Sequence, residues 1–353
     1  MWDNFIGQQI RRCNRNLLFV NLVLLAAMVV YAGFNRRYLA NFLMGTTNIS
    51  SDQLAALHDP GQRFRYFVHV HGDKSVPTGI QSVEQTLDES SQQVESEETT
   101  ADYVAVEVGQ KLLLVKAPLH STGADFSGAL EPIPSDVYDQ TIAPVLKQDP
   151  TLQSAFIPAM LDASDYRTEG YWTLGIGIPL LLLVGWNLKK WNERRADYSA
   201  TAIYKRIAAF GMPETVAQEI DTSLKMIPLE KIGQAHVSGP WLFMPWMFSM
   251  VVFHVPDIVW TYPKITKQRV YFIPVGKSYA TVIRDRFRYS YEVNGKKKNA
   301  GVLLNYISQQ VPWAPAGFTQ ELESLWLKHP EDVIAAVEER KANYGKQGGT
   351  ATT

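Results

Sequence analysis

Residues 17–34 read LLFVNLVLLAAMVVYAGF, an apolar run of 18 residues that only Asn21 and Gly33 interrupt. A second run of 18 residues, YWTLGIGIPLLLLVGWNL, occupies positions 171–188 and carries Trp172 and Trp186 near its ends. An α-helix rises about 1.5 Å per residue and the hydrocarbon core of a bilayer is about 30 Å thick, so a helix of this length reaches across it. The two runs therefore predict two transmembrane helices, and these helices determine the organisation of the chain.

Two other interpretations of these runs are weaker. A buried helix of a soluble protein usually keeps a polar stripe, and neither run has one. A cleaved signal peptide also begins with basic residues and an apolar stretch, but it ends in small residues at the cleavage site. Here the first run is followed by Asn35-Arg36-Arg37-Tyr38, which favours an uncleaved anchor.

Basic residues near the two runs predict the orientation. Three arginines (Arg11, Arg12 and Arg15) precede the first run, and four basic residues (Lys189, Lys190, Arg194 and Arg195) follow the second. The connecting segment has only Arg36, Arg37 and Arg167 close to its ends. Because cytoplasmic flanks are enriched in Lys and Arg, both termini are expected in the cytoplasm, most simply at a bacterial inner membrane. The net charges of the two soluble segments agree with this orientation, since residues 35–170 carry −10 and residues 188–353 carry +7.

The expected fold is an α+β membrane protein with five segments. They are a cytoplasmic N-terminus (1–16), a transmembrane helix (17–34), a small β-rich extracytoplasmic domain (35–170), a second transmembrane helix (171–188) and a cytoplasmic domain (189–353). The only cysteine, Cys13, lies on the cytoplasmic flank, so the outer domain has no disulfide. We expect an unmodified thiol at Cys13, with acylation as the alternative.

The outer domain contains one clear hairpin and one polar insert. Residues 103–108 and 111–115 are two strand-like runs, and Gly109-Gln110 between them suits a tight turn. Residues 81–101 are so rich in Glu, Ser, Gln and Thr that we expect a disordered insert. Ser135-Asp136 can begin a helix. A small barrel or sandwich with flanking helices fits this order.

The inner domain begins with helices and continues with strands. Helices are expected over residues 204–210 and 213–225, strands from Ile232 onward, and further helices over 300–310, 318–326 and 330–344. Residues 241–253 are apolar, but thirteen residues that include Pro245 are too few to span, so we expect a core strand there.

Part of this inner domain resembles a known family. The residues that carry the resemblance are Phe210-Gly211, residues 216–220, the segment DIVWTY at 257–262 and Pro274-Val275-Gly276-Lys277. In this order they resemble the inner half of uncharacterised bacterial two-span membrane proteins, whose cytoplasmic portion is similar to a pleckstrin-homology-like β-barrel. The resemblance covers mostly residues 200–310 and implies binding of lipid headgroups or of another protein. No binding residue carries over from it.

Catalytic signatures are few. Gly276-Lys277-Ser278 has the end of a phosphate-binding loop, but Tyr271 occupies the position of the required first glycine. No nucleophile elbow and no zinc-binding signature occurs in the sequence. His69, His71 and Asp73 alternate on an expected strand, so they face one side and can seat a metal, with an exposed polar strand face as the alternative.

A basic segment predicts contact with anionic lipid. Arg284, Arg286 and Arg288 alternate with Asp285, Phe287 and Tyr289, and Lys296, Lys297 and Lys298 follow at the next turn. On one strand face the three guanidinium groups would meet headgroups, each basic residue contributing about 1 kcal/mol. A solvated charged face is the alternative.

Two functional hypotheses follow. The first is a non-enzymatic binding or scaffolding protein of the bacterial envelope, which couples an outer domain to a cytoplasmic lipid- or protein-binding module. The second is a metal-dependent membrane enzyme, or an accessory subunit of a membrane enzyme complex. The first implies membrane lipid and a membrane or cytoplasmic protein as partners, with no cofactor and no nucleic acid.

Overall fold

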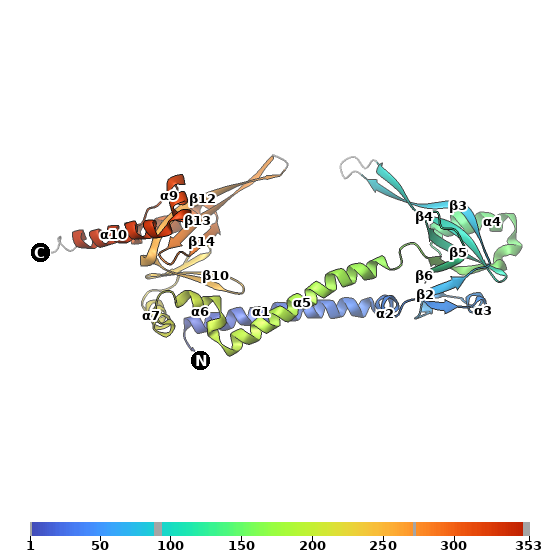
Figure 1. Cartoon of the computed structure of the whole chain (residues 1–353), viewed down its shortest axis with the longest axis horizontal. Helices are drawn as coiled ribbons and strands as arrows, with labels where there is room; N and C mark the ends of the chain where they lie inside the picture. Colours follow the sequence, from blue (N-terminus) through green and yellow to red (C-terminus); the bar gives the residue numbers. More distant parts are fainter. Residues whose placement is uncertain (1, 88–93, 271–272, 349–353) are drawn as a thin grey trace. The chain divides into compact units, whose positions relative to one another are not determined.

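The computed structural model describes residues 2–87, 94–270 and 273–348. The chain divides into two compact units, each with its own core (Figure 1). The central unit is Leu24–Leu183, and the terminal unit combines Met1–Val23 with Val184–Thr353. Helices α1 (Phe5–Phe34) and α5 (Thr168–Ala196) contribute residues to both units. Both helices are long and apolar enough to cross a membrane.

One mixed sheet forms the central unit. Its seven strands lie in the order β1-β2-β6-β7-β5-β4-β3, with parallel pairing of β1 to β2 and of β5 to β7. The strands are β1 (Thr47–Ile49), β2 (Phe67–His71), β3 (Lys74–Leu87), β4 (Val94–Val108), β5 (Lys111–Pro118), β6 (Asp125–Glu131) and β7 (Phe156–Asp162). Alternate residues of β2, β4 and β5 supply the buried apolar core. The unit is therefore a single open sheet among its described residues, not the expected barrel or sandwich.

Helices and turns complete this unit. The helical elements are α2 (Arg36–Met44), α3 (Ser51–Ala55), η1 (Pro60–Gln62), α4 (Ser135–Gln148) and η2 (Pro150–Ala155). Ser50 and Gln53 close a capping box at the start of α3. The hairpin expected at Gly109 is confirmed, because Val108 pairs with Lys111 and Gly109 has a φ of 65°. The helix expected from Ser135 is α4, and Val137 packs against the sheet.

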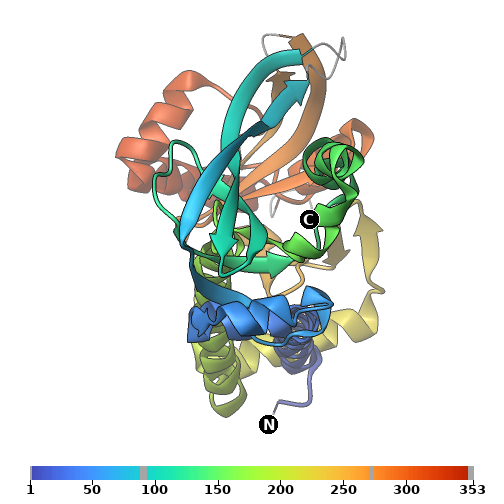
Figure 2. The same ribbon diagram turned by 90° about the vertical axis from the view of Figure 1, so that its right-hand side faces the viewer.

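The expected disorder of residues 81–101 is wrong for the part of this segment that the structure describes. Residues 81–87 pair with residues 94–102 in an antiparallel ladder, and positions 88–93 lie outside the described residues. Figure 2 shows this long β3–β4 hairpin extending beyond the other strands of its sheet. Polar cross-strand pairs replace a core here: Gln85 Nε2 donates to Glu97 Oε1 over 2.7 Å, and Gln81 Nε2 donates to Asp102 Oδ1 over 2.9 Å.

Close packing joins α2 and the start of α5 to the sheet of the central unit. The Tyr38 hydroxyl donates to the Tyr166 carbonyl over 3.1 Å and accepts from the Gly170 amide over 2.8 Å. A Cβ at Gly170 would lie 2.1 Å from the Phe42 ring, so glycine permits this approach. Phe42 also packs with Phe67 in a small aromatic core.

The terminal unit contains two antiparallel sheets. A four-stranded sheet has the order β11-β10-β9-β8, and a three-stranded sheet has the order β12-β13-β14. The strands are β8 (Glu230–Ile232), β9 (Ala235–Ser238), β10 (Trp241–Pro245), β11 (Met250–His254), β12 (Ile258–Val270), β13 (Ile273–Asp285) and β14 (Ser290–Gly295). Among the described strands no ladder joins one sheet to the other, so both sheets are open and a closed barrel is not observed.

Helices flank these sheets. They are η3 (Tyr198–Ala200), α6 (Ala202–Ile207), α7 (Pro213–Met226), η4 (Val255–Asp257), α8 (Lys297–Gln310), α9 (Gln320–Lys328) and α10 (Pro330–Gly348). Residues 241–253 do not form a span, as expected, but they form the β10–β11 hairpin and not one strand. Ile6, Ile10 and Cys13 of α1 pack with Trp241 and Phe243 of β10, so the start of α1 belongs to the core of this unit.

Candidate functional site

The two long apolar helices expose apolar surface that a soluble core helix would bury. Val29 and Phe34 of α1 are 70% and 87% exposed, and Trp172 and Leu182 of α5 are 68% and 69% exposed. Exposed apolar area costs about 25 cal/mol per Å² in water. This exposed apolar surface is compatible with insertion of both helices into a membrane.

Asparagines pair the two helices within the terminal unit. Asn187 Nδ2 of α5 donates to Asn21 Oδ1 of α1 over 3.3 Å. Two turns earlier in α1, Asn14 Nδ2 donates to the Trp191 carbonyl over 3.1 Å. Asn14 and Asn21 are both buried. These bonds fix α1 against α5 at the ends of the helices that carry the basic flanks.

A cavity of about 280 Å³ lies between these flanks. Four arginines line it, and no carboxylate does. The lining residues are Ile10, Arg11, Asn14, Arg15 and Leu18 of α1 together with Trp191, Arg194, Arg195 and Tyr198 from α5 and η3. The site thus combines four positive charges with apolar walls.

Polar atoms in this cavity are incompletely paired. Asn14 Oδ1 and the Tyr198 hydroxyl are buried and have no hydrogen-bond partner among the described residues. Arg15 forms no ion pair with any described residue. Arg11 Nη1 donates to the Trp2 carbonyl over 2.8 Å, and Arg195 lies 5.6 Å from the centre of the Trp191 ring. Buried polar atoms are normally satisfied, so these two atoms leave one donor and one acceptor beside the four arginines for a ligand or an ordered water.

The loop between β10 and β11 lies beside the same helix ends. Asn16 Nδ2 donates to the Met247 carbonyl over 2.9 Å, and Arg194 Nη1 donates to the Phe248 carbonyl over 3.5 Å. The side chains of Trp246, Met247 and Phe248 are nevertheless exposed. We call residues 246–248 the apolar loop. It presents three large apolar side chains next to the start of the apolar stretch of α1.

The prediction that Arg284 meets lipid is wrong, because its side chain is buried. Its guanidinium lies 4.5 Å from the centre of the Trp260 ring and 5.2 Å from that of Trp326. It also forms a 2.9 Å ion pair with Glu323 of α9. The aromatic rings and the carboxylate compensate the buried charge, so Arg284 attaches α9 to the sheet.

Arg286 and Arg288 do not share a strand face with Arg284, because β13 ends at Asp285. Both lie in the following turn, where Arg288 has a φ of 62°. Arg286 Nε forms a 3.1 Å ion pair with Asp257, and Arg288 pairs with Glu331 over 3.1 Å. The prediction of one shared strand face for the three arginines is therefore wrong, because the strand ends and a turn begins between Arg284 and Arg286.

The three lysines at 296–298 are exposed at the start of α8. Strand β14, six residues long, separates them from the arginine turn, a distance of about 20 Å along the strand. The structure therefore does not bring Lys296, Lys297 and Lys298 together with the arginines into one basic patch.

The three predicted metal ligands are not assembled as a group. His69 and His71 share one face of β2, where His69 Nδ1 lies 2.9 Å from Ser127 Oγ and His71 forms an ion pair with Asp125 of β6. Asp73 Oδ2 instead accepts from the Gly109 amide over 2.9 Å, at the end of the β4–β5 hairpin. Across the described ranges no group of three or more His, Cys, Asp or Glu side chains could hold a metal ion.

Two buried carboxylates that we did not predict as important hold the terminal unit together. Asp285 forms a buried ion pair with Arg206 of α6 and accepts from the Phe287 and Tyr289 amides. Asp257 binds His254 Nδ1 over 2.8 Å as well as Arg286. Burial raises the pKa of Asp257, but His254, Arg286 and Lys341 outweigh it and hold the pKa below 3.8.

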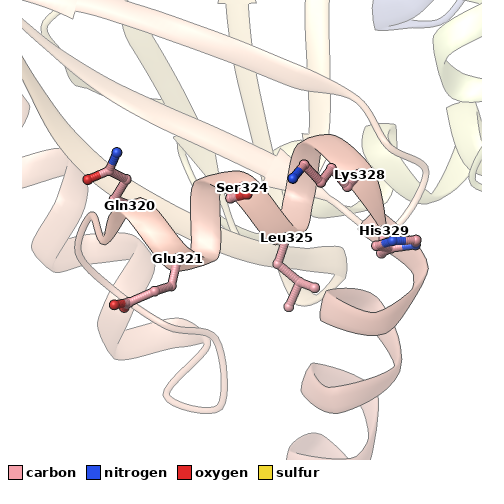
Figure 3. A pocket seen from close by; sticks show the side chains of 6 residues that line it. All are labelled: Gln320, Glu321, Ser324, Leu325, Lys328 and His329. Atoms are coloured by element: carbon pink, nitrogen blue, oxygen red, sulfur yellow. The ribbon is translucent and has the colours of Figure 1, made fainter.

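A larger hollow of about 500 Å³ covers the exposed side of α9 as far as His329, the residue before α10 (Figure 3). The hollow is lined by Gln320, Glu321, Ser324, Leu325, Lys328 and His329. These side chains point in different directions in Figure 3 and converge on no common point. The basic cavity between α1 and α5 is the stronger candidate because its charges share one sign and two buried polar atoms of its lining residues, Asn14 Oδ1 and the Tyr198 hydroxyl, lack partners among the described residues.

Comparison with known proteins places the chain in no group: no protein-family profile, no curated protein and no solved structure matches it. The residues of the basic cavity entered the sequence analysis only as a sign of orientation. The spacing of these residues could have indicated a shared surface, since positions 11, 14, 15 and 18 lie on one face of α1, and positions 191, 194 and 195 lie on one face of α5.

Proposed function

We propose that the chain is a non-enzymatic, membrane-anchored binding or scaffolding protein of the bacterial envelope. In this proposal α1 and α5 cross the inner membrane, both termini are cytoplasmic, and the central unit lies outside. The exposed apolar stretches of both helices and the basic residues at one end of each support it. Asn21 and Asn187 pair the helices, as polar residues do between transmembrane helices.

The terminal unit is, in this proposal, a pleckstrin-homology-like module that binds lipid or protein. Its two antiparallel sheets followed by α8 are the elements that a small barrel with flanking helices requires. The chain couples this module to the central unit through α1, which begins in the core of the terminal unit and ends beside α2. This continuous helix supports a role in which the chain either transmits a change from one unit to the other or holds the two units on opposite sides of the membrane.

The observation that carries the proposal is the attachment of the apolar loop to the helix ends. Asn16 and Arg194 bind its carbonyls, while Trp246, Met247 and Phe248 leave their side chains exposed. Trp and other large apolar residues favour the membrane interface. Contact of the terminal unit with lipid is therefore assigned to this loop, in place of the strand that carries Arg284.

Depth measurement tests this assignment. In a Cys13→Ser background, Met247→Cys is labelled with an environment-sensitive fluorophore and reconstituted into liposomes whose lipids carry a quencher at the headgroup. We expect strong quenching at position 247. The control is Leu327→Cys on α9, an apolar site that is 72% exposed, against 54% for Met247, and that does not belong to the apolar loop. Equal quenching at both sites, or none at 247, would contradict the proposed contact.

A further inference from the structure

The basic cavity between α1 and α5 has the features of a lipid headgroup site. Its volume of about 280 Å³ lies just below the roughly 300–1,000 Å³ typical of small-molecule sites, which suits a headgroup and not a large cofactor. Leu18, at the start of the apolar stretch of α1, is part of its wall. A ligand in the cavity can therefore place a polar group among the arginines and leave its apolar part along the helices.

We propose that this cavity binds the phosphate diester headgroup of an anionic lipid of the phosphatidylglycerol type. The inference rests on the proposed membrane anchoring. Arg11, Arg15, Arg194 and Arg195 surround the space without a lining carboxylate. Arg11 also pairs with Asp3 over 3.5 Å, but Arg15, Arg194 and Arg195 form no ion pair with any described residue, so an anionic ligand suits the cavity better than a neutral or cationic one. Guanidinium groups match phosphate oxygens in geometry as well as in charge.

The two unpaired polar atoms restrict which kind of headgroup fits the cavity. The Tyr198 hydroxyl is a free donor that a phosphate oxygen can accept from, since no described residue pairs with it. Asn14 Oδ1 is an acceptor, because Nδ2 of the same amide already donates to the Trp191 carbonyl. An acceptor beside a phosphate site calls for a donor on the ligand. A headgroup with hydroxyl groups beyond its phosphate supplies that donor and keeps the net negative charge.

The location also distinguishes this site from a free-phosphate site. The cavity lies between helices whose next residues are apolar and exposed, and basic pockets in this position are suited to acidic headgroups. Trp191 adds an aromatic wall, with Arg195 stacked 5.6 Å from its ring centre. A lipid gains from both the charges and the apolar walls, whereas soluble phosphate gains from the charges alone.

Binding to the full-length protein in non-ionic detergent tests the proposal. The melting temperature is measured with added short-chain phosphatidylglycerol, short-chain phosphatidylcholine or glycerol 3-phosphate, because a ligand that binds the folded state raises it. We expect phosphatidylglycerol to bind and phosphatidylcholine to have little effect. Glycerol 3-phosphate should bind at least about tenfold more weakly than phosphatidylglycerol, since it lacks the chains. Equal binding of the free phosphate would overturn the assignment to lipid.

Two charge-matched variants identify the site. Arg15→Gln/Arg195→Gln removes two lining arginines, and Arg12→Gln/Lys189→Gln removes two neighbouring basic residues that do not line the cavity. Loss of two charge-assisted contacts should weaken phosphatidylglycerol binding by about tenfold or more in the first variant and by much less in the second. Equal weakening in both variants would mean that only the general surface charge acts, and the site would be rejected.

A third variant and a separate assay complete the test. Tyr198→Phe removes only the hydroxyl, and we expect weaker phosphatidylglycerol binding without loss of the basal melting temperature. Release of the wild-type chain from membranes by alkaline carbonate would refute the proposed anchoring. A chain that stays embedded but binds phosphatidylglycerol and phosphatidylcholine equally would refute the headgroup site alone.

Discussion

Asn187 of α5 and Asn21 of α1 form a hydrogen bond of 3.3 Å, and Asn21 is almost completely buried. Asn21 Nδ2 donates at the same time to the Leu17 carbonyl of its own helix over 2.6 Å. Both polar groups of this amide are therefore used, one within α1 and one toward α5. In an apolar environment this pairing sets the register of the two helices.

We predict that Asn187→Leu lowers the stability of the helix pair by about 1 kcal/mol, because it leaves Asn21 Oδ1 without its partner. Unfolding of the full chain by SDS titration from mixed micelles measures the change. Asn35→Leu is the control, since Asn35 directly follows α1 and its Nδ2 donates to the Tyr31 carbonyl of α1, not to α5. The double variant Asn21→Leu/Asn187→Leu should lose less than the sum of its single variants. Strict additivity would show that the two side chains do not interact.

Replacement of the predicted lipid-binding arginines should have unequal effects. Arg284→Gln leaves Glu323 without its partner and removes a cation from three aromatic rings, so we expect a loss of about 3 kcal/mol. Arg288→Gln breaks only an exposed ion pair with Glu331 and should change stability by less than about 0.5 kcal/mol. Thermal unfolding of the full chain compares them. Similar, small effects of both variants would show that Arg284 is not held in the core.

Acid should remove the contribution of Asp257 to stability. Its pKa in the folded state lies below 3.8, so the carboxylate stabilises the fold above that value and the contribution is lost as pH falls through the folded pKa. Asp257→Asn should therefore lower the melting temperature at neutral pH, and the difference from wild type should shrink below about pH 4. The exposed Glu339→Gln should differ little from wild type at any pH. A difference for Asp257→Asn that is constant with pH would contradict this role.

Two deletions of different length in the β3–β4 hairpin compare how much its exposed end and its packed base contribute to stability. A variant in which an Asn-Gly turn joins Ser82 to Thr100 removes a ladder whose described side chains are largely exposed, so the melting temperature should change little. Deletion of residues 81–101 also removes Ala101, which is buried and pairs with Pro118 of β5. We expect this larger deletion to lower the melting temperature clearly. Equal effects of the two deletions would show that the base of the hairpin does not pack.

Sequence patterns predicted helices and turns correctly where a single pattern covered the whole helix or turn. The two apolar runs, the turn at Gly109 and the helix from Ser135 all appear in the structure, because the length of an apolar run and the geometry of a turn act within a few residues. The polar segment 81–101 failed as a prediction of disorder, since composition carries no information on cross-strand pairing with a neighbour.

The candidate site was harder to predict for a related reason. Arg284 looked exposed because it alternates with aromatic residues, but its environment comes from Trp326 and Glu323 on a helix far along the chain. The turn that begins at Arg286 ended the alternation. The basic cavity needs two segments about 180 residues apart, so its arginines could be found as a stripe on each helix but not as one site.

Accessibility of single cysteines in intact cells tests the central proposal most directly. In the Cys13→Ser background, Ser96→Cys in β4 and Ser324→Cys in α9 replace exposed serines of the central and terminal units. A membrane-impermeant maleimide is applied to spheroplasts before and after lysis. The proposed topology predicts labelling of position 96 in intact spheroplasts and of position 324 only after lysis. Labelling of 324 in intact spheroplasts, or protection of 96 until lysis, would contradict the proposed topology.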